Sequence, residues 1–344
     1  MIGDAPPFWW ERPGWQALAL APASLVYGRA AGWMMDRARP ATVPLPVLCI
    51  GNFTVGGSGK TPAAIAMAQA AIAAGHRPGF LSRGHGGASA GPHLVDRDHD
   101  SARHVGDEPL LLAAHAPVAV TPDRKAGAAL LKEQGCDFLI LDDGFQSRRI
   151  HFDYSLLVVD ARRGLGNGHV IPAGPVRAPL VTQLRHADAL LVMGDGDAAA
   201  QVVRLAARAA RPVFHAHVEP VEPVRFAGRK FVAFAGIGEP EKFYDTLESC
   251  AGYIAATRNF PDHHLYSDDD LRELQALAVS NGARLITTAK DAARLIGGSA
   301  LARSILQDLE ILEVRTVFDS QGAAGRIIRQ TMESFRERRA TAPA

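Results

Sequence analysis

The sequence predicts an α/β fold in which helices flank a mostly parallel sheet. Short apolar runs bounded by turn residues recur along the chain, as expected for strands that are buried on both faces. Helical patterns separate these runs, and strands joined through helices form right-handed βαβ units with a parallel sheet. The predicted strands before residue 195 are 45–50, 77–82, 117–121, 137–142, 155–160 and 188–193.

A second series of predicted strands follows an alanine-rich helix at residues 198–210. We expect these strands to build a smaller α/β lobe, with a ligand bound in the cleft between the two lobes. The expected strands are 212–218, 230–235, 252–258, 284–288 and 310–317. The expected domains are an N-terminal helical segment at 1–40, a core at 41–210, the smaller lobe at 211–330 and a frayed tail at 331–344.

The composition is that of an ordinary globular protein. With 344 residues, of which 47% are hydrophobic, the chain can build a full core without disulfide or metal cross-links. Its formal net charge of +1 creates no overall field that would attract nucleic acid, so we expect no nucleic-acid partner and a local site for any anion. The cysteines Cys49, Cys136 and Cys250 lack paired spacing, and we expect buried, reduced thiols in a cytosolic compartment.

The N-terminal segment at residues 8–35 is rich in aromatic and apolar residues. Charged residues and prolines interrupt it, so it offers neither the run of about 20 apolar residues that crosses a bilayer nor the pattern of a signal peptide. Its tryptophans and the basic residues Arg29, Arg37 and Arg39 suit a helix that lies in the headgroup region of a membrane. A helical hairpin packed on the surface of the protein itself is the other open interpretation.

The strongest motif is a glycine-rich loop between the strand that ends at Gly51 and a helix expected at 61–74. In a phosphate-binding loop, backbone N–H groups surround the phosphates, a lysine reaches the outer oxygens and the next hydroxyl binds Mg²⁺. Lys60 and Thr61 fit these two roles, so the sequence predicts nucleoside triphosphate and Mg²⁺ in a P-loop NTPase-like core. Thr54 departs from the strict pattern, which has glycine there. The loop residues are Thr54, Val55, Gly56, Gly57, Ser58, Gly59, Lys60 and Thr61.

Two adjacent carboxylates follow the predicted strand 137–142. Asp142 and Asp143 stand at the C-terminal edge of a buried strand, where ligands bind in open α/β sheets. Because phosphoryl transfer needs a metal ligand near the P-loop, we expect one of the two to hold Mg²⁺ directly or through water. For Asp143 alone, a role in an Asp-Gly turn stays open.

Further residues are candidates for proton transfer and phosphate binding. Asp107 is either a functional acid or the N-cap of the helix that follows it. Asp262 beside His263 has the arrangement that tunes a histidine for proton transfer, with a zinc site or an ordinary hydrogen-bonding loop as alternatives. Arg83 and Arg124 follow strand ends and are either phosphate ligands or surface residues.

Taken in order, these motifs resemble those of the tetraacyldisaccharide 4'-kinase family, the lipid A 4'-kinases of Gram-negative bacteria. The likeness runs from about residue 10 to residue 330, and so many ordered motifs are far more specific than the P-loop alone. The matching segments are 54–62, Ser82-Arg83-Gly84, Gly106-Asp107-Glu108-Pro109, Asp142-Asp143-Gly144-Phe145-Gln146, Pro172-Ala173-Gly174-Pro175, Asp262-His263-His264 and Lys290-Asp291.

The resemblance implies ATP-dependent phosphorylation of the 4'-hydroxyl of a tetraacylated glucosamine disaccharide 1-phosphate, giving lipid IVA. It implies an acylated disaccharide lipid as substrate and work at the cytoplasmic face of the inner membrane, which favours membrane docking of the N-terminal segment. By position, Asp107 corresponds to the catalytic base and is paired with His263, which Asp262 helps to orient. Gln146 joins the acidic pair near Mg²⁺ and is a further substrate candidate. The family often has glutamate where this chain has Ala178.

A P-loop ATPase switch that controls a membrane or partner interaction is the alternative function, because such proteins share the Gly-Gly-x-Gly-Lys-Thr loop. Against it, Val55 stands where many of those proteins carry a signature lysine. The second lobe also adds proton-transfer residues that a switch does not need. We therefore expect a kinase, and the sequence indicates no obligatory protein partner.

Overall fold

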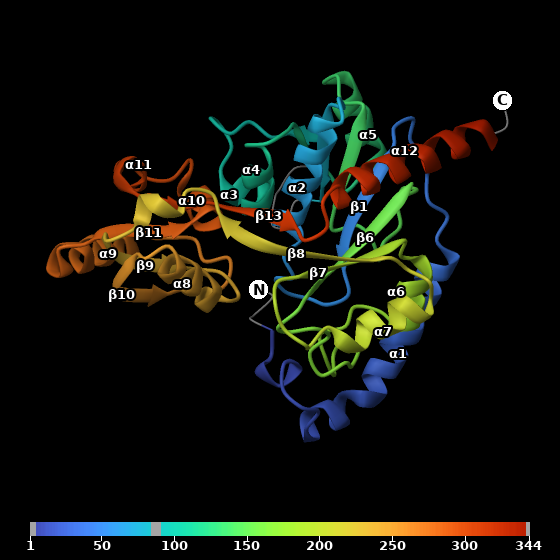
Figure 1. Ribbon diagram of the computed structural model, residues 1–344, viewed down its shortest axis with the longest axis horizontal. Coiled ribbons are helices and arrows are strands. Elements are labelled where there is room, and N and C mark those ends of the chain that lie inside the picture. Colours follow the sequence, from blue (N-terminus) through green and yellow to red (C-terminus); the bar gives the residue numbers. More distant parts are fainter. Residues whose placement is uncertain (1–4, 84–90, 342–344) are drawn as a thin grey trace.

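The protein consists of a large α/β core and a smaller α/β lobe, seen in a computed structural model that describes residues 5–83 and 91–341 (Figure 1). Within these residues, nine strands form the central sheet in the order β13-β8-β7-β6-β1-β5-β2-β4-β3. All inner pairs are parallel, and only the edge strands β3 and β13 run antiparallel to their neighbours. The strands are β1 (Val47–Asn52), β2 (Pro78–Ser82), β3 (His93–Leu94), β4 (Val118–Val120), β5 (Phe138–Asp142), β6 (Tyr154–Asp160), β7 (Ala189–Met193), β8 (Val213–Pro220) and β13 (Val314–Phe318).

The six strands expected before residue 195 are all present, so the predicted α/β class with a mostly parallel sheet is confirmed. Successive residues of β1 face opposite sides of the sheet, so Leu48 and Ile50 pack into one hydrophobic cluster while Val47 and Cys49 pack into the other. This double burial explains why the strands read as continuous apolar runs. All three cysteines are buried free thiols, as the sequence predicted.

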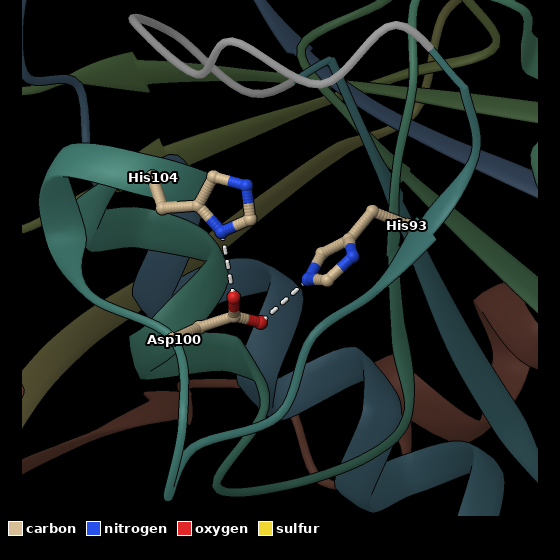
Figure 2. A group of neighbouring side chains, drawn as sticks. All are labelled: His93, Asp100 and His104. Atoms are coloured by element: carbon tan, nitrogen blue, oxygen red, sulfur yellow. Dashed lines mark hydrogen bonds and ion pairs between the residues drawn. The ribbon is translucent and has the colours of Figure 1, made fainter.

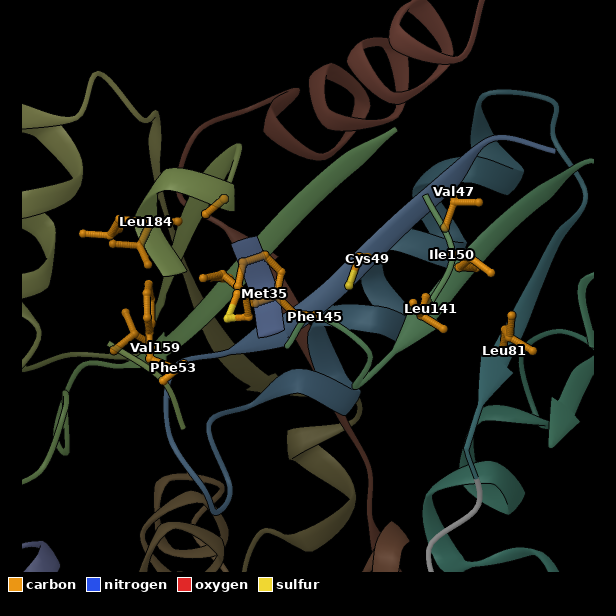
Figure 3. Packing of buried hydrophobic residues seen from close by; sticks show 14 of the residues in the cluster. Met35, Val47, Cys49, Phe53, Leu81, Leu141, Phe145, Ile150, Val159 and Leu184 are labelled. Carbon is orange, nitrogen blue, oxygen red and sulfur yellow. The ribbon is translucent and has the colours of Figure 1, made fainter. Parts of the chain in front are cut away.

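Helices cover both faces of the central sheet. On one face α2 and the long C-terminal helix α12 bury Met67 and Ile327 beside Phe80. On the other face α5, α6 and α7 close the cluster that includes Leu141, Val159 and Leu184 (Figure 3). The helices of the core are α1 (Trp15–Arg37), α2 (Lys60–Ala73), α3 (Ala102–Val105), α4 (Asp107–Leu112), α5 (Arg124–Glu133), α6 (Leu180–His186), α7 (Ala200–Arg208) and α12 (Ala323–Thr341).

The smaller lobe has its own parallel sheet of four strands in the order β10-β9-β11-β12. Separate hydrophobic clusters on its two faces include Phe234 with Leu274 and Phe231 with Leu247. The lobe therefore has a core of its own beside the main one. Its elements are β9 (Lys230–Ala235), α8 (Pro240–Ser249), β10 (Tyr253–Asn259), α9 (Asp268–Asn281), β11 (Arg284–Thr288), α10 (Ala289–Leu295), α11 (Ala300–Asp308) and β12 (Glu310–Leu312).

The structure corrects the expected division between the lobes. The strand expected at 212–218 belongs to the central sheet, because β8 pairs with β7. The single strand expected at 310–317 is two strands that are interrupted at Glu313, with β12 in the small sheet and β13 back in the central sheet. The chain thus leaves the core after β8 and returns through β13. The pairing of strands depends on residues that are far apart in the sequence, so the local pattern of apolar residues did not reveal it.

The structure also corrects the expected frayed tail at 331–344 as far as Thr341, and residues 342–344 lie outside the described residues. Helix α12 continues to Thr341, and Phe335 is buried on it. Arg338 donates to both carboxylate oxygens of the fully buried Asp153, at 2.7 and 3.0 Å, and to the carbonyl oxygens of Val43 and Leu45. Helix α12 is therefore fastened to the start of β1, because Asp153 also accepts the backbone N–H of Val47.

We expect Arg338→Met to destabilise the protein by about 3 kcal/mol, because it leaves the buried Asp153 carboxylate without its cation. The measurement is the free energy of unfolding from urea denaturation. Arg336→Met, on the exposed side of the same helix, is the matched control and should leave stability nearly unchanged. Equal stability of the two variants would show that the ion pair does not hold the tail.

Candidate phosphoryl-transfer site

The glycine-rich loop connects β1 to α2 in the geometry that a phosphate-binding loop requires. Gly56 and Gly59 have φ values of +104° and +84°, which favour glycine. A side chain at Gly59 would also come within 2.9 Å of Met193. Lys60 is the first residue of α2, so the backbone N–H groups and the positive end of the helix dipole face the loop.

A neighbouring segment clamps this loop from outside. The N–H of Val55 donates to the carbonyl of Pro175, and the N–H of Arg177 donates to the carbonyl of Phe53, both at 2.9 Å. The Arg177 guanidinium also donates to the carbonyl of Thr54 at 3.1 Å. The Pro-Ala-Gly-Pro motif at 172–175 therefore has a structural role, because it holds the first residues of the P-loop in place.

The acidic pair lies beside the loop because β5 and β1 are parallel neighbours, with Asp142 opposite Ile50. Asp143 has a φ of +51° and accepts from Arg177 at 2.8 and 3.1 Å. Its carboxylate lies 3.9 Å from the Lys60 ammonium. Two cations thus share Asp143, and both stand where phosphate charge would need them.

Asp142 is the member of the pair with an unsatisfied oxygen. Its side chain is buried, and among the described residues its Oδ1 atom has no hydrogen-bond partner; the same holds for the Ser58 hydroxyl. Burial, followed by repulsion from Glu108, raises the pKa of Asp142 to about 7. A carboxylate oxygen with nearby hydroxyls is the donor set that Mg²⁺ prefers, so these residues fit that ion.

A second group of charges assembles where the small lobe meets the core. Asp107 is the first residue of α4, and its Oδ2 atom lies 2.8 Å from Nε of Arg294 and 3.2 Å from Nδ1 of His263. Lys290 lies 3.9 Å from the same oxygen. Burial alone would raise the pKa of Asp107, but the hydrogen bond with His263 and the charges of Lys290 and Arg294 outweigh it and hold that pKa below its usual range. Asp107 is therefore ionised at neutral pH.

His263 reaches this group from the loop after β10. Its backbone has a φ of +60° and its N–H donates to the carbonyl of Gly236 at 3.1 Å. The imidazole is 54% exposed, with Nε2 lying 3.8 Å from Asp262 on the side away from Asp107. The structure thus brings together the three residues that the sequence singled out from two distant segments. His264 instead lies 3.0 Å from Asp270 at the start of α9, and no metal-ligand cluster occurs at this loop among the described residues.

Arg294 is the site residue that the sequence analysis missed. Its side chain is 1% exposed and donates to Gly236 and Asp291, both at 2.6 Å, as well as to Asp107. The buried Asp291 in turn accepts from the Tyr266 hydroxyl at 2.8 Å. The spacing of Lys290 and Arg294, four residues apart on α10, places both on one helix face and is the signal that could have revealed Arg294.

The two groups of charges are close enough to influence each other. Glu108, next to Asp107, repels the Asp142 carboxylate and lies 3.4 Å from Lys290. Burial favours the neutral form of Lys290, but Glu108 and Asp107 outweigh burial and raise the pKa of its ammonium. Helix α4 therefore connects the charges around Asp107 to the acidic pair beside the glycine-rich loop.

The remaining candidates, Arg83, Arg124 and Gln146, differ in their burial and in the contacts that they make. Arg124 is buried near the acidic pair, and burial lowers its pKa to about 10 although Cys49 and both aspartates oppose that shift. Arg83 is exposed at the end of β2, and Gly84 of the same motif lies outside the described residues. Gln146 donates to the carbonyl of Asn52 at 2.7 Å and to Gln183 at 3.0 Å. The structure therefore uses the Gln146 amide nitrogen to fix the end of β1.

We expect Asp142→Asn to stabilise the Mg²⁺-free protein, and to do so more at about pH 8 than at about pH 5. The pKa of Asp142 is raised to about 7 in the fold, so the folded state binds this proton more tightly than the unfolded state does. Wild-type stability therefore falls as the pH rises toward 7. The measurement is the thermal midpoint of both proteins in chelator across this range.

Asp269→Asn, at an exposed residue of α9, is the control for a general effect of removing a carboxylate. Added Mg²⁺ should reduce the advantage of Asp142→Asn, because the wild type regains a cation for its carboxylate. A gain in stability that is equal at both pH values would contradict a raised pKa.

A family model, two relatives in sequence and one solved structure all indicate the same protein family. A family model described as Tetraacyldisaccharide-1-P 4'-kinase matches residues 16–333. Proteins named Tetraacyldisaccharide 4'-kinase from Mesorhizobium japonicum and Brucella melitensis are 58% and 55% identical, each over 98% of this chain and 99% of the relative. The crystal structure of LpxK from Aquifex aeolicus in complex with ATP is similar, with a TM-score of 0.69 and 25% identity over 92% of this chain and 99% of that chain.

Proposed function

The chain belongs to the tetraacyldisaccharide 4'-kinase family of lipid A biosynthesis, and we propose that Asp107 and His263 activate the acceptor hydroxyl while the P-loop holds ATP. The reaction transfers the γ-phosphoryl group of ATP to the 4'-hydroxyl of a tetraacylated disaccharide 1-phosphate. One observation carries the assignment of the base: the buried Asp107 carboxylate contacts His263, Arg294 and Lys290 at the meeting of the two lobes.

In this mechanism Asp107 accepts a hydrogen bond from the 4'-hydroxyl and orients its oxygen toward the phosphorus. Phosphoryl transfer proceeds through a loose transition state, so a carboxylate that is ionised when the substrate binds suffices to position the nucleophile and then accept its proton. His263 lies 3.2 Å away and its ring is half exposed, so the proton can pass on to solvent. Arg294 acts as a positioning residue, because its guanidinium donates to the Asp107 carboxylate and holds it in place.

The phosphates bind where the P-loop N–H groups, Lys60 and Arg177 converge. In the structure both cations contact Asp143, which keeps them in place for the phosphate charge. Asp142 and Thr61 would hold Mg²⁺, which supplies neutralisation of the charge that develops on the phosphate oxygens. Positioning and electrostatic stabilisation by these residues account for most of the catalysis.

We expect Asp107→Asn to lower kcat by about 10²- to 10⁴-fold, because the asparagine amide cannot accept the hydroxyl proton. The protein should stay folded, because the amide oxygen can still accept the hydrogen bond from Arg294. The measurement is transfer of labelled γ-phosphate from ATP to the disaccharide 1-phosphate lipid in detergent micelles. Lys60→Ala serves as the blank and Asp269→Asn as the folded, exposed control.

A folded Asp107→Asn enzyme with normal kcat would remove Asp107 from the mechanism. ATP hydrolysis by the wild type without labelled lipid would instead favour the ATPase switch.

We further propose that α1 docks the enzyme on the cytoplasmic face of the inner membrane. One face of this helix packs on the core, where Gly28 and Gly32 allow close approach to Val170 and Pro179. The opposite face leaves large apolar side chains exposed, among them Trp15 at 74% and Trp33 at 60%. Within the described part of the chain, no helix combines the length and the apolar character needed to cross a bilayer. An apolar face of this kind with nearby arginines suits the headgroup region.

The N-terminal segment also reaches the nucleotide site. The short helix η1 (Pro7–Trp9) packs on the core through Trp9, whose indole N–H donates to the carbonyl of Pro172 at 3.0 Å. Trp10 lies over the Arg163 guanidinium and borders Gly56 of the P-loop. Docking through α1 would therefore bring the P-loop near a substrate whose acyl chains stay in the bilayer.

We expect Trp33→Ser combined with Met34→Ser to reduce binding to anionic phospholipid vesicles about 100-fold or more, because burial of these two side chains contributes about 1.5–3 kcal/mol each. The measurement is flotation of the protein with the vesicles. Val224→Ser, at an exposed apolar residue of the small lobe that lies outside α1, is the matched control. Unchanged flotation of the double variant would exclude this face as the docking surface.

A further inference from the structure

A cluster of metal-ligating side chains lies apart from the phosphoryl-transfer site. Nε2 of His93 lies 2.6 Å from one carboxylate oxygen of Asp100, and Nδ1 of His104 lies 2.7 Å from the other (Figure 2). One ligand atom from each residue falls within 4.8 Å of the others, and no other such group of three occurs among the described residues. The kinase mechanism uses none of these side chains.

The three side chains come from separate elements that converge on one point. His93 is in the edge strand β3, Asp100 is in the loop that follows, and His104 is in the one-turn helix α3. Asp100 is buried, and its carboxylate also accepts the N–H of Asp96 at 2.9 Å. This hydrogen bond fixes the orientation of the carboxylate. The imidazoles of His93 and His104 are partly exposed, so an ion has access from solvent.

Two imidazoles and one carboxylate are the protein ligands of many zinc sites, in which water takes the fourth tetrahedral position. Metal–ligand lengths of about 2.0–2.1 Å place tetrahedral ligand atoms about 3.3 Å apart. The hydrogen bonds of 2.6 and 2.7 Å would have to open by about 0.6 Å while the two imidazoles approach each other. His104 sits on a four-residue helix and its side chain is 46% exposed, so it has room for this movement.

We propose that His93, Asp100 and His104 bind one Zn²⁺ ion, with water as the fourth ligand. The site would join the edge of the central sheet to α3. Gly106 ends α3 and directly precedes Asp107 at the start of α4, so the ion would steady the segment that carries the proposed base. The loop after α10 packs on the same point, because a side chain at Gly297 would come within 3.0 Å of Ser101.

The test is a Zn²⁺ titration of the untagged, full-length protein in competition with a chromogenic chelator. Excess Mg²⁺ keeps the acidic pair at the P-loop occupied. We expect about one Zn²⁺ per chain, and binding at least about 100-fold weaker in His93→Gln combined with His104→Gln, because two of the three protein ligands are lost. His99→Gln is the matched control, since His99 is exposed nearby and contacts only Asp96 outside the cluster.

Absence of saturable binding in the wild type, or undiminished binding in the double variant, would overturn the proposal. The three side chains would then form only a structural hydrogen-bonded group. Circular dichroism shows whether the double variant folds. If it does not, the Co²⁺-loaded wild type decides: the strong visible absorption of tetrahedral Co²⁺ supports the site, and the weak absorption of octahedral Co²⁺ contradicts it.

Discussion

The ion pair between Arg294 and Asp107 is the buried contact between the two lobes on which the geometry of the proposed site rests. Arg294 belongs to α10 of the small lobe, yet it donates to Asp107 at the start of α4 in the core. The same side chain donates to Gly236 and Asp291, so its charge is neutralised and hydrogen-bonded within the lobe. Removing one partner of a buried ion pair typically costs about 3–5 kcal/mol, because the remaining charge is left buried without compensation.

The meeting of the two lobes sets the electrostatics of the site. The core contributes Asp107, Glu108 and Asp142, and Glu108 stands close enough to Asp142 to repel its carboxylate. The small lobe contributes a hydrogen bond with His263 and the charges of Lys290 and Arg294, which together keep Asp107 ionised. Asp142 lies beyond this group, and its raised pKa shows that the protein alone does not compensate its charge. A divalent cation would supply the missing compensation, which links metal binding to the chemistry of the acceptor side.

The sequence determined the parts of the protein that depend on short-range patterns. Six strands of the core, the P-loop and the position of Asp142 and Asp143 at a strand end all follow from apolar periodicity and local glycine spacing. The same reasoning identified Asp107, Asp262 and His263 as candidates, but only the resemblance to a family paired them. Its account of Gln146 as a substrate candidate was incomplete, because nothing local indicates that this amide bonds to Asn52 and Gln183.

Only the tertiary structure decided the contacts that join distant segments. Asp107 and Arg294 are 187 residues apart, and β8 and β13 return the chain to the central sheet on either side of the small lobe. It also showed that the tail is helical and held by Asp153, and that α1 is packed on one face and apolar on the other. The physical reason is that helix and strand periods are set by neighbouring residues, whereas pairing partners depend on burial and charge across the whole fold.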